Sequence, residues 1–124
     1  MTILNQKVQQ EIVARILQDR AQRSQFLTQM KQRQEQGWQV ARQAAQVLKT
    51  EFGVQRTVLF GSMLDVEALT WHSDIDLAVW GLAPCDLFKA GARIEQEHDF
   101  DIDLVPVELA KPHIITAIRQ GIEL

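Results

Sequence analysis

Two aspartates open a stretch that otherwise has the composition of a β-strand. The stretch runs through residues 73–80, and Asp74 and Asp76 precede or interrupt its apolar residues. At this spacing both carboxylates lie on one face of a strand, with Cα atoms about 6.6 Å apart. Like charges this close repel, and each raises the pKa of the other unless a cation lies between them. Such a pair suits Mg²⁺, a hard ion that prefers oxygen ligands.

Two further features extend this candidate metal site. In residues 100–107, Asp101 and Asp103 face the side opposite to the apolar residues between and beside them. Gly61 and Ser62 follow directly on another strand-like stretch, where a glycine permits a tight turn close to a phosphate and a serine adds a hydroxyl donor. A phosphate-binding turn together with metal-binding carboxylates is the equipment of phosphoryl or nucleotidyl transfer.

The elements that must position these residues follow from periodicity and turn residues. Pro106 suggests that the last strand ends there or lies at a sheet edge. In the helix expected between the second and third strands, Leu87, Phe88, Ala90 and Ile94 are predicted to face inward. We expect strands at residues 54–60, 74–80 and 100–107, and helices at 38–52, 85–97 and 111–120. This order predicts an α/β (α+β) domain with a small mixed β-sheet flanked by helices.

The N-terminal region is predicted to be a long helix. Residues 5–36 contain neither Gly nor Pro and show apolar residues every four positions from Val8 to Ile16, and Gly37 is read as a break before the next helix. This divides the chain into an N-terminal helical arm, 1–36, and a domain, 37–124. The arm could contact its own domain, a second copy in a homodimer, a partner protein or RNA. Its basic residues are scattered, which favours a protein contact.

Composition and charge limit the class of protein. The chain has 124 residues and a formal charge of −3, which fits one small globular domain. Residues 1–50 carry a net charge of +5 and residues 51–124 a net charge of −8. The acidic half disfavours direct binding of nucleic acid. With no apparent signal peptide, no membrane-spanning stretch and a single Cys85, we expect a cytoplasmic protein that does not bind membranes.

Three motifs in order resemble a known family. They are Val-Leu-Phe-Gly61-Ser62, Ser73-Asp74-Ile75-Asp76-Leu77-Ala78 and Ile102-Asp103-Leu104-Val105. Together they resemble the minimal nucleotidyltransferase domains of the DNA polymerase beta superfamily, over residues 38–124. The resemblance implies a polymerase beta-like fold in which Asp74 and Asp76 hold two Mg²⁺ ions. It implies Asp103 as the third metal-binding and catalytic carboxylate, with Asp101 as our second choice. It also implies that Gly61 and Ser62 bind the β and γ phosphates of ATP.

The resemblance is greatest to stand-alone domains that pair with a helical HEPN-type toxin. It implies an antitoxin that transfers AMP from ATP to a hydroxyl of that toxin. The family pattern Gly-Ser-x-Ala-Arg-Gly is here Gly61-Ser62-Met63-Leu64-Asp65-Val66, without the basic residue and the second glycine. Two alternatives therefore stay open: a catalytically weak or inactive antitoxin that acts by direct binding, and a transferase with a small-molecule acceptor of the aminoglycoside kind.

Overall fold

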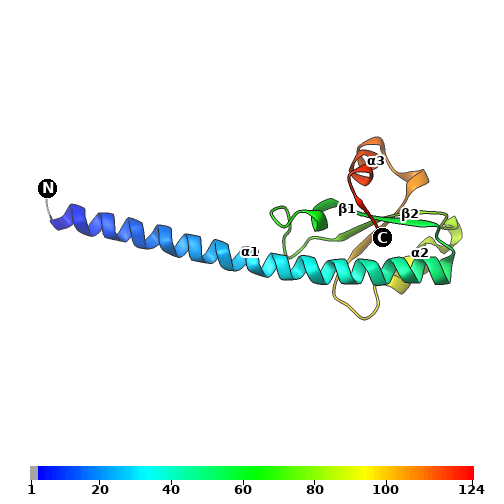
Figure 1. Cartoon of the computed structure of the whole chain (residues 1–124), viewed down its shortest axis with the longest axis horizontal. Coiled ribbons are helices and arrows are strands. Elements are labelled where there is room, and N and C mark those ends of the chain that lie inside the picture. Colours follow the sequence, from blue (N-terminus) through cyan, green and yellow to red (C-terminus); the bar gives the residue numbers. More distant parts are fainter. Residues whose placement is uncertain (1–2) are drawn as a thin grey trace.

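The computed structural model describes residues 3–124, with side chains from residue 5, and consists of one very long helix beside a small sheet (Figure 1). The long helix α1 projects far beyond the sheet at its N-terminal end. Along the chain the elements are α1 (Ile3–Phe52), β1 (Arg56–Phe60), η1 (Gly61–Leu64), β2 (Ile75–Trp80), η2 (Pro84–Asp86), α2 (Leu87–Ile94), β3 (Ile102–Pro106), η3 (Val107–Leu109), α3 (Pro112–Arg119) and β4 (Ile122–Glu123).

The four strands form one mixed sheet in the order β3-β2-β1-β4. β1 runs antiparallel to both β2 and β4, whereas β2 and β3 are parallel. Helices lie on both faces of this sheet, so the predicted mixed sheet flanked by helices is confirmed. The prediction from Pro106 is also confirmed, since β3 is an edge strand that ends at that residue.

Alternating side chains of the strands build two separate apolar layers. Leu59, Leu77 and Val79 pack with residues of α1 and α2 on one face, where most of the core lies. Val58, Phe60 and Ala78 pack with Ile118 of α3 on the other face. Asp76 and Asp103 alternate with the first set, so they belong to the face that α3 partly covers. The catalytic candidates thus lie across the sheet from α1.

The predicted helix break at Gly37 is wrong, because α1 continues through it to Phe52. Gly37 is buried, and a Cβ atom there would lie 2.6 Å from Sδ of Met63 and 3.4 Å from Cε1 of Phe100. The glycine therefore serves close packing of α1 against η1 rather than an interruption of the helix. Nothing in the local sequence distinguishes these two uses of a glycine.

This close packing leads to a stability prediction. Gly37→Ala is expected to lower the free energy of unfolding by about 1 kcal/mol, because overlap with the buried Met63 outweighs the better helix propensity of alanine. Gly91 of α2 is the matched control, since a Cβ there meets nothing within 4 Å. Gly91→Ala should be neutral or stabilising in the same urea titration. A Gly37→Ala variant more stable than the parent would contradict the packing role.

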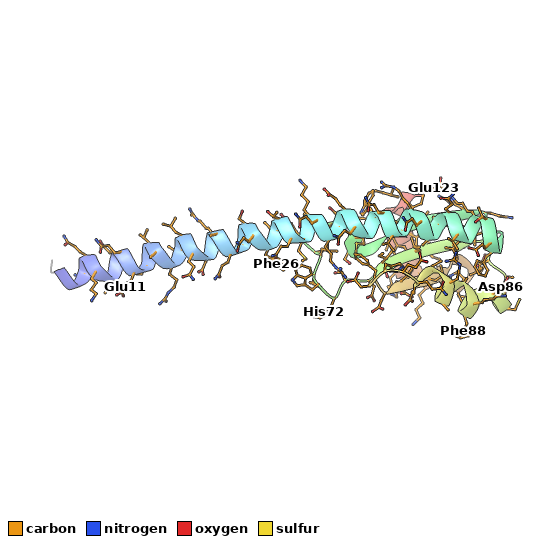
Figure 2. The ribbon with its side chains drawn as sticks, turned by 90° about the horizontal axis from the view of Figure 1, so that it is seen from below. Glu11, Phe26, His72, Asp86, Phe88 and Glu123 are labelled. Carbon is orange, nitrogen blue, oxygen red and sulfur yellow. The ribbon has the colours of Figure 1, made fainter. Side chains whose placement is uncertain are left out.

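Two other expectations from the sequence need correction. The helix expected at 85–97 is shorter, since residues 84–86 form a 3-10 turn and α2 ends at Ile94. Phe88, predicted to face inward, is 90% exposed, because it lies about 100° around the helix from Leu87 and away from the sheet (Figure 2). The short strand β4 was not expected; it pairs with β1 through Ile122 and Glu123.

In residues 3–124 we find no helix with both the length and the apolar character that crossing a membrane requires.

Candidate functional site

Asp76 lies at the centre of the candidate site, between β1 and β3. Within the sheet it pairs with Phe60, the last residue of β1, and with Asp103 of β3. In a parallel pair, residues in register direct their side chains to the same face, about 4.8 Å apart. The register therefore brings the carboxylates of Asp76 and Asp103 together, and it places both beside the turn that begins at Gly61.

The two flanking carboxylates differ from Asp76 in exposure. Asp74 and Asp103 are exposed, whereas Asp76 is half-buried. Burial, the negative charge of Asp103 and then that of Asp74 together raise the pKa of Asp76 to about 6, and burial contributes most. An ionised carboxylate at this position lowers the stability of the fold, and a neutral side chain would not. Such an unfavourable carboxylate is typical of a functional site.

The raised pKa predicts how stability depends on pH. Between the ordinary value of 3.8 and about 6 the folded chain binds more protons at Asp76 than the unfolded chain. Stability therefore falls as pH rises through this window. Above it Asp76 is ionised, and the full loss of stability from its ionisation is present. In thermal melts of the metal-free protein, Asp76→Asn should remove this part of the pH dependence. An unchanged pH profile in the variant would contradict the raised pKa of Asp76.

Gly61, the first residue of the turn, lies against the side chain of Asp76. Its φ of +83° lies in the left-handed region, where side chains are strained. A Cβ atom at this position would also overlap Oδ2 of Asp76. Backbone and carboxylate thus meet at Gly61, where a larger residue would push them apart.

Ser62 and Met63 continue this turn as η1. Ser62 is half-buried, and the residue before η1, Phe60, provides no side-chain cap. The carbonyl oxygen of Met63 accepts two hydrogen bonds from α1, from Gln34 Nε2 at 2.9 Å and Trp38 Nε1 at 2.8 Å. Gln34 and Trp38 therefore fix the position of the turn.

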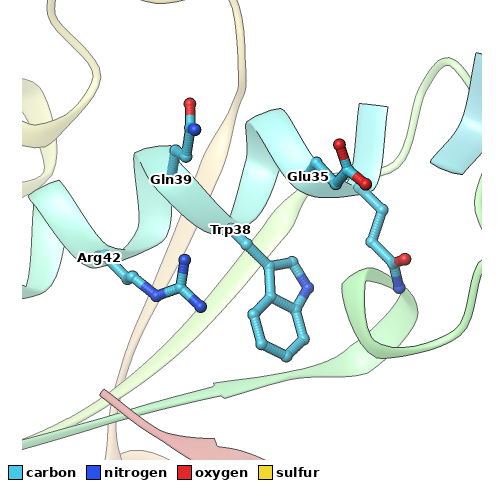
Figure 3. A pocket seen from close by; sticks show the side chains of 5 residues that line it. Glu35, Trp38, Gln39 and Arg42 are labelled. Atoms are coloured by element: carbon cyan, nitrogen blue, oxygen red, sulfur yellow. The ribbon is translucent and has the colours of Figure 1, made fainter. Parts of the chain in front are cut away.

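Sequence reasoning missed this positioning role of Gln34 and Trp38. Their spacing of four residues places them on one helix face, which is the signal that could have indicated a shared partner. Figure 3 shows the indole of Trp38 leaving α1 beside Arg42, whose guanidinium carbon lies 5.5 Å from the ring centroid. These side chains, with Glu35 and Gln39, line a surface hollow of about 460 Å³.

The loop between η1 and β2 is held by its own polar side chains. Oδ1 of Asp65 accepts a hydrogen bond from the backbone N–H of Glu67 at 3.0 Å, which forms an Asx turn. Thr70 N–H donates to Oγ of Ser73 at 2.9 Å. Asp65 stands at the position where the family pattern has an arginine. In this chain its side chain shapes the loop.

Asp101 and Asp103 have different surroundings. The carbonyl of Asp101 accepts a hydrogen bond from Ile75 N–H at 2.9 Å, so its backbone joins the start of the parallel pair, while its side chain is exposed. Only Asp103 of the two acts on the pKa of Asp76. The structure thus brings together Asp74, Asp76, Asp103 and Gly61, and it leaves the carboxylate of Asp101 outside this group. Their roles in catalysis stay predictions.

The donor set fits a hard divalent cation. The carboxylates of Asp103 and Asp74 are near enough to Asp76 to add to the rise of its pKa, and a cation among the three would oppose that contribution. Within the part of the chain that the structure describes, no three carboxylate, imidazole or thiolate side chains form a ready-made metal cluster. The group is therefore a set of converging acids rather than a closed ligand cage.

A family model matches most of the chain. The model of the family described as Polymerase beta, Nucleotidyltransferase matches residues 42–124, which is two-thirds of the chain and includes all four strands. The search of curated proteins and the search of solved structures each gave no match. The matched region contains Gly61, Ser62 and the three converging aspartates, and it excludes the exposed part of α1.

Proposed function

Since the chain belongs to the polymerase beta nucleotidyltransferase family, we propose that it transfers AMP from ATP to a hydroxyl of a partner protein in a Mg²⁺-dependent reaction. The observation that carries this proposal is the meeting of Gly61, Asp76 and Asp103 at one end of three adjacent strands. A backbone turn for phosphates beside converging carboxylates supplies what nucleotidyl transfer needs.

The proposed roles follow from position. Asp74, Asp76 and Asp103 would hold the magnesium ions, which supply charge neutralisation for the phosphates and favour deprotonation of the attacking hydroxyl. The backbone of Gly61 and the hydroxyl of Ser62 would bind the β and γ phosphates. The acceptor oxygen forms a bond to the α-phosphorus, the bond from this phosphorus to the β-phosphate oxygen breaks, and pyrophosphate leaves. The chain contributes positioning and electrostatic stabilisation.

Exposure of the site supports a protein as acceptor. Asp74 and Asp103 are exposed at the surface, so a hydroxyl carried on another protein can reach the reacting phosphate without entering a deep cavity. The family resemblance makes a helical HEPN-type toxin the first acceptor to test. The proposed antitoxin would act by nucleotidylating this partner.

The test follows the label of α-³²P-ATP in the presence of Mg²⁺, this protein and a helical HEPN-type protein as acceptor. We expect label on the acceptor protein, release of pyrophosphate, and loss of both in an Asp74→Asn/Asp76→Asn variant. Label on an added aminoglycoside but not on protein would favour a small-molecule acceptor.

The remaining alternative is an antitoxin that acts by binding. It would give no label with any acceptor, together with a complex that forms equally well with the parent and with the double variant. The altered Gly-Ser loop supports this alternative, because Asp65 replaces the basic residue of the family pattern.

A further inference from the structure

Helix α1 holds the turn η1 at one atom, the carbonyl oxygen of Met63. Gln34 Nε2 and Trp38 Nε1 both donate to this oxygen, at 2.9 and 2.8 Å. In Figure 3 the indole nitrogen of Trp38 points from α1 toward the turn. A carbonyl oxygen has two lone pairs, so the two bonds use its whole capacity as an acceptor.

Packing of the Met63 side chain strengthens this attachment. The side chain is fully buried in the core between the sheet and α1. Its sulfur lies so close to Gly37 that a Cβ atom on that glycine would overlap it. Gln34, Gly37 and Trp38 are three and four residues apart, so they share one face of α1. One helix face therefore holds this end of the turn by both hydrogen bonds and packing.

The first residue of the same turn faces the acids instead. Gly61 lies against the side chain of Asp76, on the face of the sheet that α1 does not cover. Ser62 is the one residue between the two attached residues of the turn, so its backbone N–H and its hydroxyl are positioned from both sides. Groups that are fixed in advance bind a ligand with little further loss of conformational entropy.

We propose that Gln34 and Trp38 are positioning residues for the nucleotide. Without touching ATP, they set its affinity by holding Gly61 and Ser62 in the conformation that binds its β and γ phosphates. This inference rests on the proposed function, in which these phosphates bind to the turn. Because α1 lies across the sheet from the carboxylates, the two residues act on phosphate binding rather than on the chemical step. Their effect is therefore expected in KM for ATP and not in kcat.

The surroundings of the two hydrogen bonds favour positioning over a purely structural role. Both bonds are only partly buried. Water can therefore satisfy the Met63 carbonyl when a donor is removed, and the fold avoids an unpaired buried group without them. Water cannot hold the turn at a fixed distance from α1. Loss of a donor should thus loosen the turn more than it lowers the stability of the domain.

Gln34→Glu tests the first donor. Glutamate keeps the length and the helix propensity of glutamine, but its ionised carboxylate has no hydrogen to donate. The probe is the Mg²⁺ complex of an ATP analogue with a methylene group between the α and β phosphates. Calorimetry should give a Kd about tenfold higher than that of the parent. Gln39→Glu is the matched control, because Gln39 is exposed on the same helix and the change of charge is the same.

Trp38→Phe removes the second donor without adding a charge. The Kd for the analogue should again rise by about tenfold, and the double variant with Gln34→Glu should bind more weakly than either single variant. Trp80→Phe is the control, since Trp80 ends β2 at the far end from Asp76. Both controls should change the Kd by less than about threefold. In the labelling assay, KM for ATP should rise with the Kd while kcat changes by less than about threefold.

The indole N–H of Trp38 gives a direct readout of the turn by nuclear magnetic resonance. The chain has three tryptophans, and Trp→Phe variants assign their indole signals. Binding of the analogue to the parent should shift the signal of Trp38, although this residue lies across the sheet from the acids. The signal of Trp80 should stay in place.

The outcomes separate this inference from the proposed function. Variants that stay folded in urea titrations and bind the analogue as tightly as the parent would overturn the positioning role, as would a loss of kcat with an unchanged KM. Weaker binding by the variants, with no label on any acceptor, would support the positioning role and contradict the proposed transfer. A parent that does not bind the analogue would overturn both.

Discussion

Replacing Asp76 by asparagine is expected to lower nucleotidyl transfer by about a thousandfold or more while the domain stays folded. Asp76 lies in register with Asp103 and beside Gly61, so its carboxylate is central to the converging group. Asparagine has nearly the same shape but cannot supply the negative charge that a divalent cation requires. Single-turnover measurements with labelled ATP, at saturating Mg²⁺ and acceptor, give the effect directly.

Asp101→Asn is the matched control for this prediction. Asp101 lies two residues from Asp103, is exposed, and uses its backbone carbonyl rather than its carboxylate to join β2. Activity should change less than threefold on the same scale. The Asp76→Asn chain should be at least as stable as the parent at neutral pH, because a carboxylate whose pKa is raised to about 6 has been removed. Equal losses in the two variants would contradict the assignment of Asp76.

Replacing Gly61 by alanine is expected to cost both stability and activity. The positive φ alone costs about 1 to 2 kcal/mol for an L-residue. Overlap of the new Cβ with Oδ2 of Asp76 adds a cost of the same order, which is relieved only if the turn or the carboxylate moves. Either movement separates the phosphate turn from the central acid, so kcat/KM for ATP should fall by about a hundredfold.

Gly53→Ala separates the two costs. Gly53 also has a positive φ, of +67°, but a Cβ there would meet nothing within 4 Å. This variant should lose only the conformational part, about 1 kcal/mol in a urea titration, and should keep its activity. If Gly61→Ala were no less stable than Gly53→Ala and fully active, close approach of backbone and carboxylate would not matter for the site.

The strands were predictable from sequence because their patterns are local. Alternation around Ile102 and the Asp-x-Asp start of β2 each indicate a strand with a polar end. Gly37 was not predictable, since its reason is the side chain of Met63, which packs against it from another part of the chain. Phe88 was placed inside because an apolar residue next to Leu87 fits an inward face, although one step along the helix turns it by about 100° and away from the sheet. β4 has two residues, too few for a pattern.

The members of the candidate site were predictable, whereas their arrangement was not. Residue type and order indicated Gly61, Ser62 and the aspartates, but the sequence left Asp101 and Asp103 as alternatives. The parallel register of β2 and β3 determines which of them is beside Asp76, and register depends on the whole sheet. The hydrogen bonds from Gln34 and Trp38 to Met63 join residues more than 20 positions apart, so no local pattern contains them.

The position of β3 at the sheet edge gives Asp103 a second physical role. An edge strand offers unpaired backbone groups to strands of other molecules, and such edges are a common route to aggregation. Here the strand is five residues long, carries an exposed charge near its start and ends in Pro106, all of which discourage edge-to-edge pairing. The opposite edge, β4, has only two residues. The charge of Asp103, which the proposed chemistry requires, also discourages pairing of this edge with strands of other molecules. Neutral replacements of Asp103 should therefore promote self-association through the sheet.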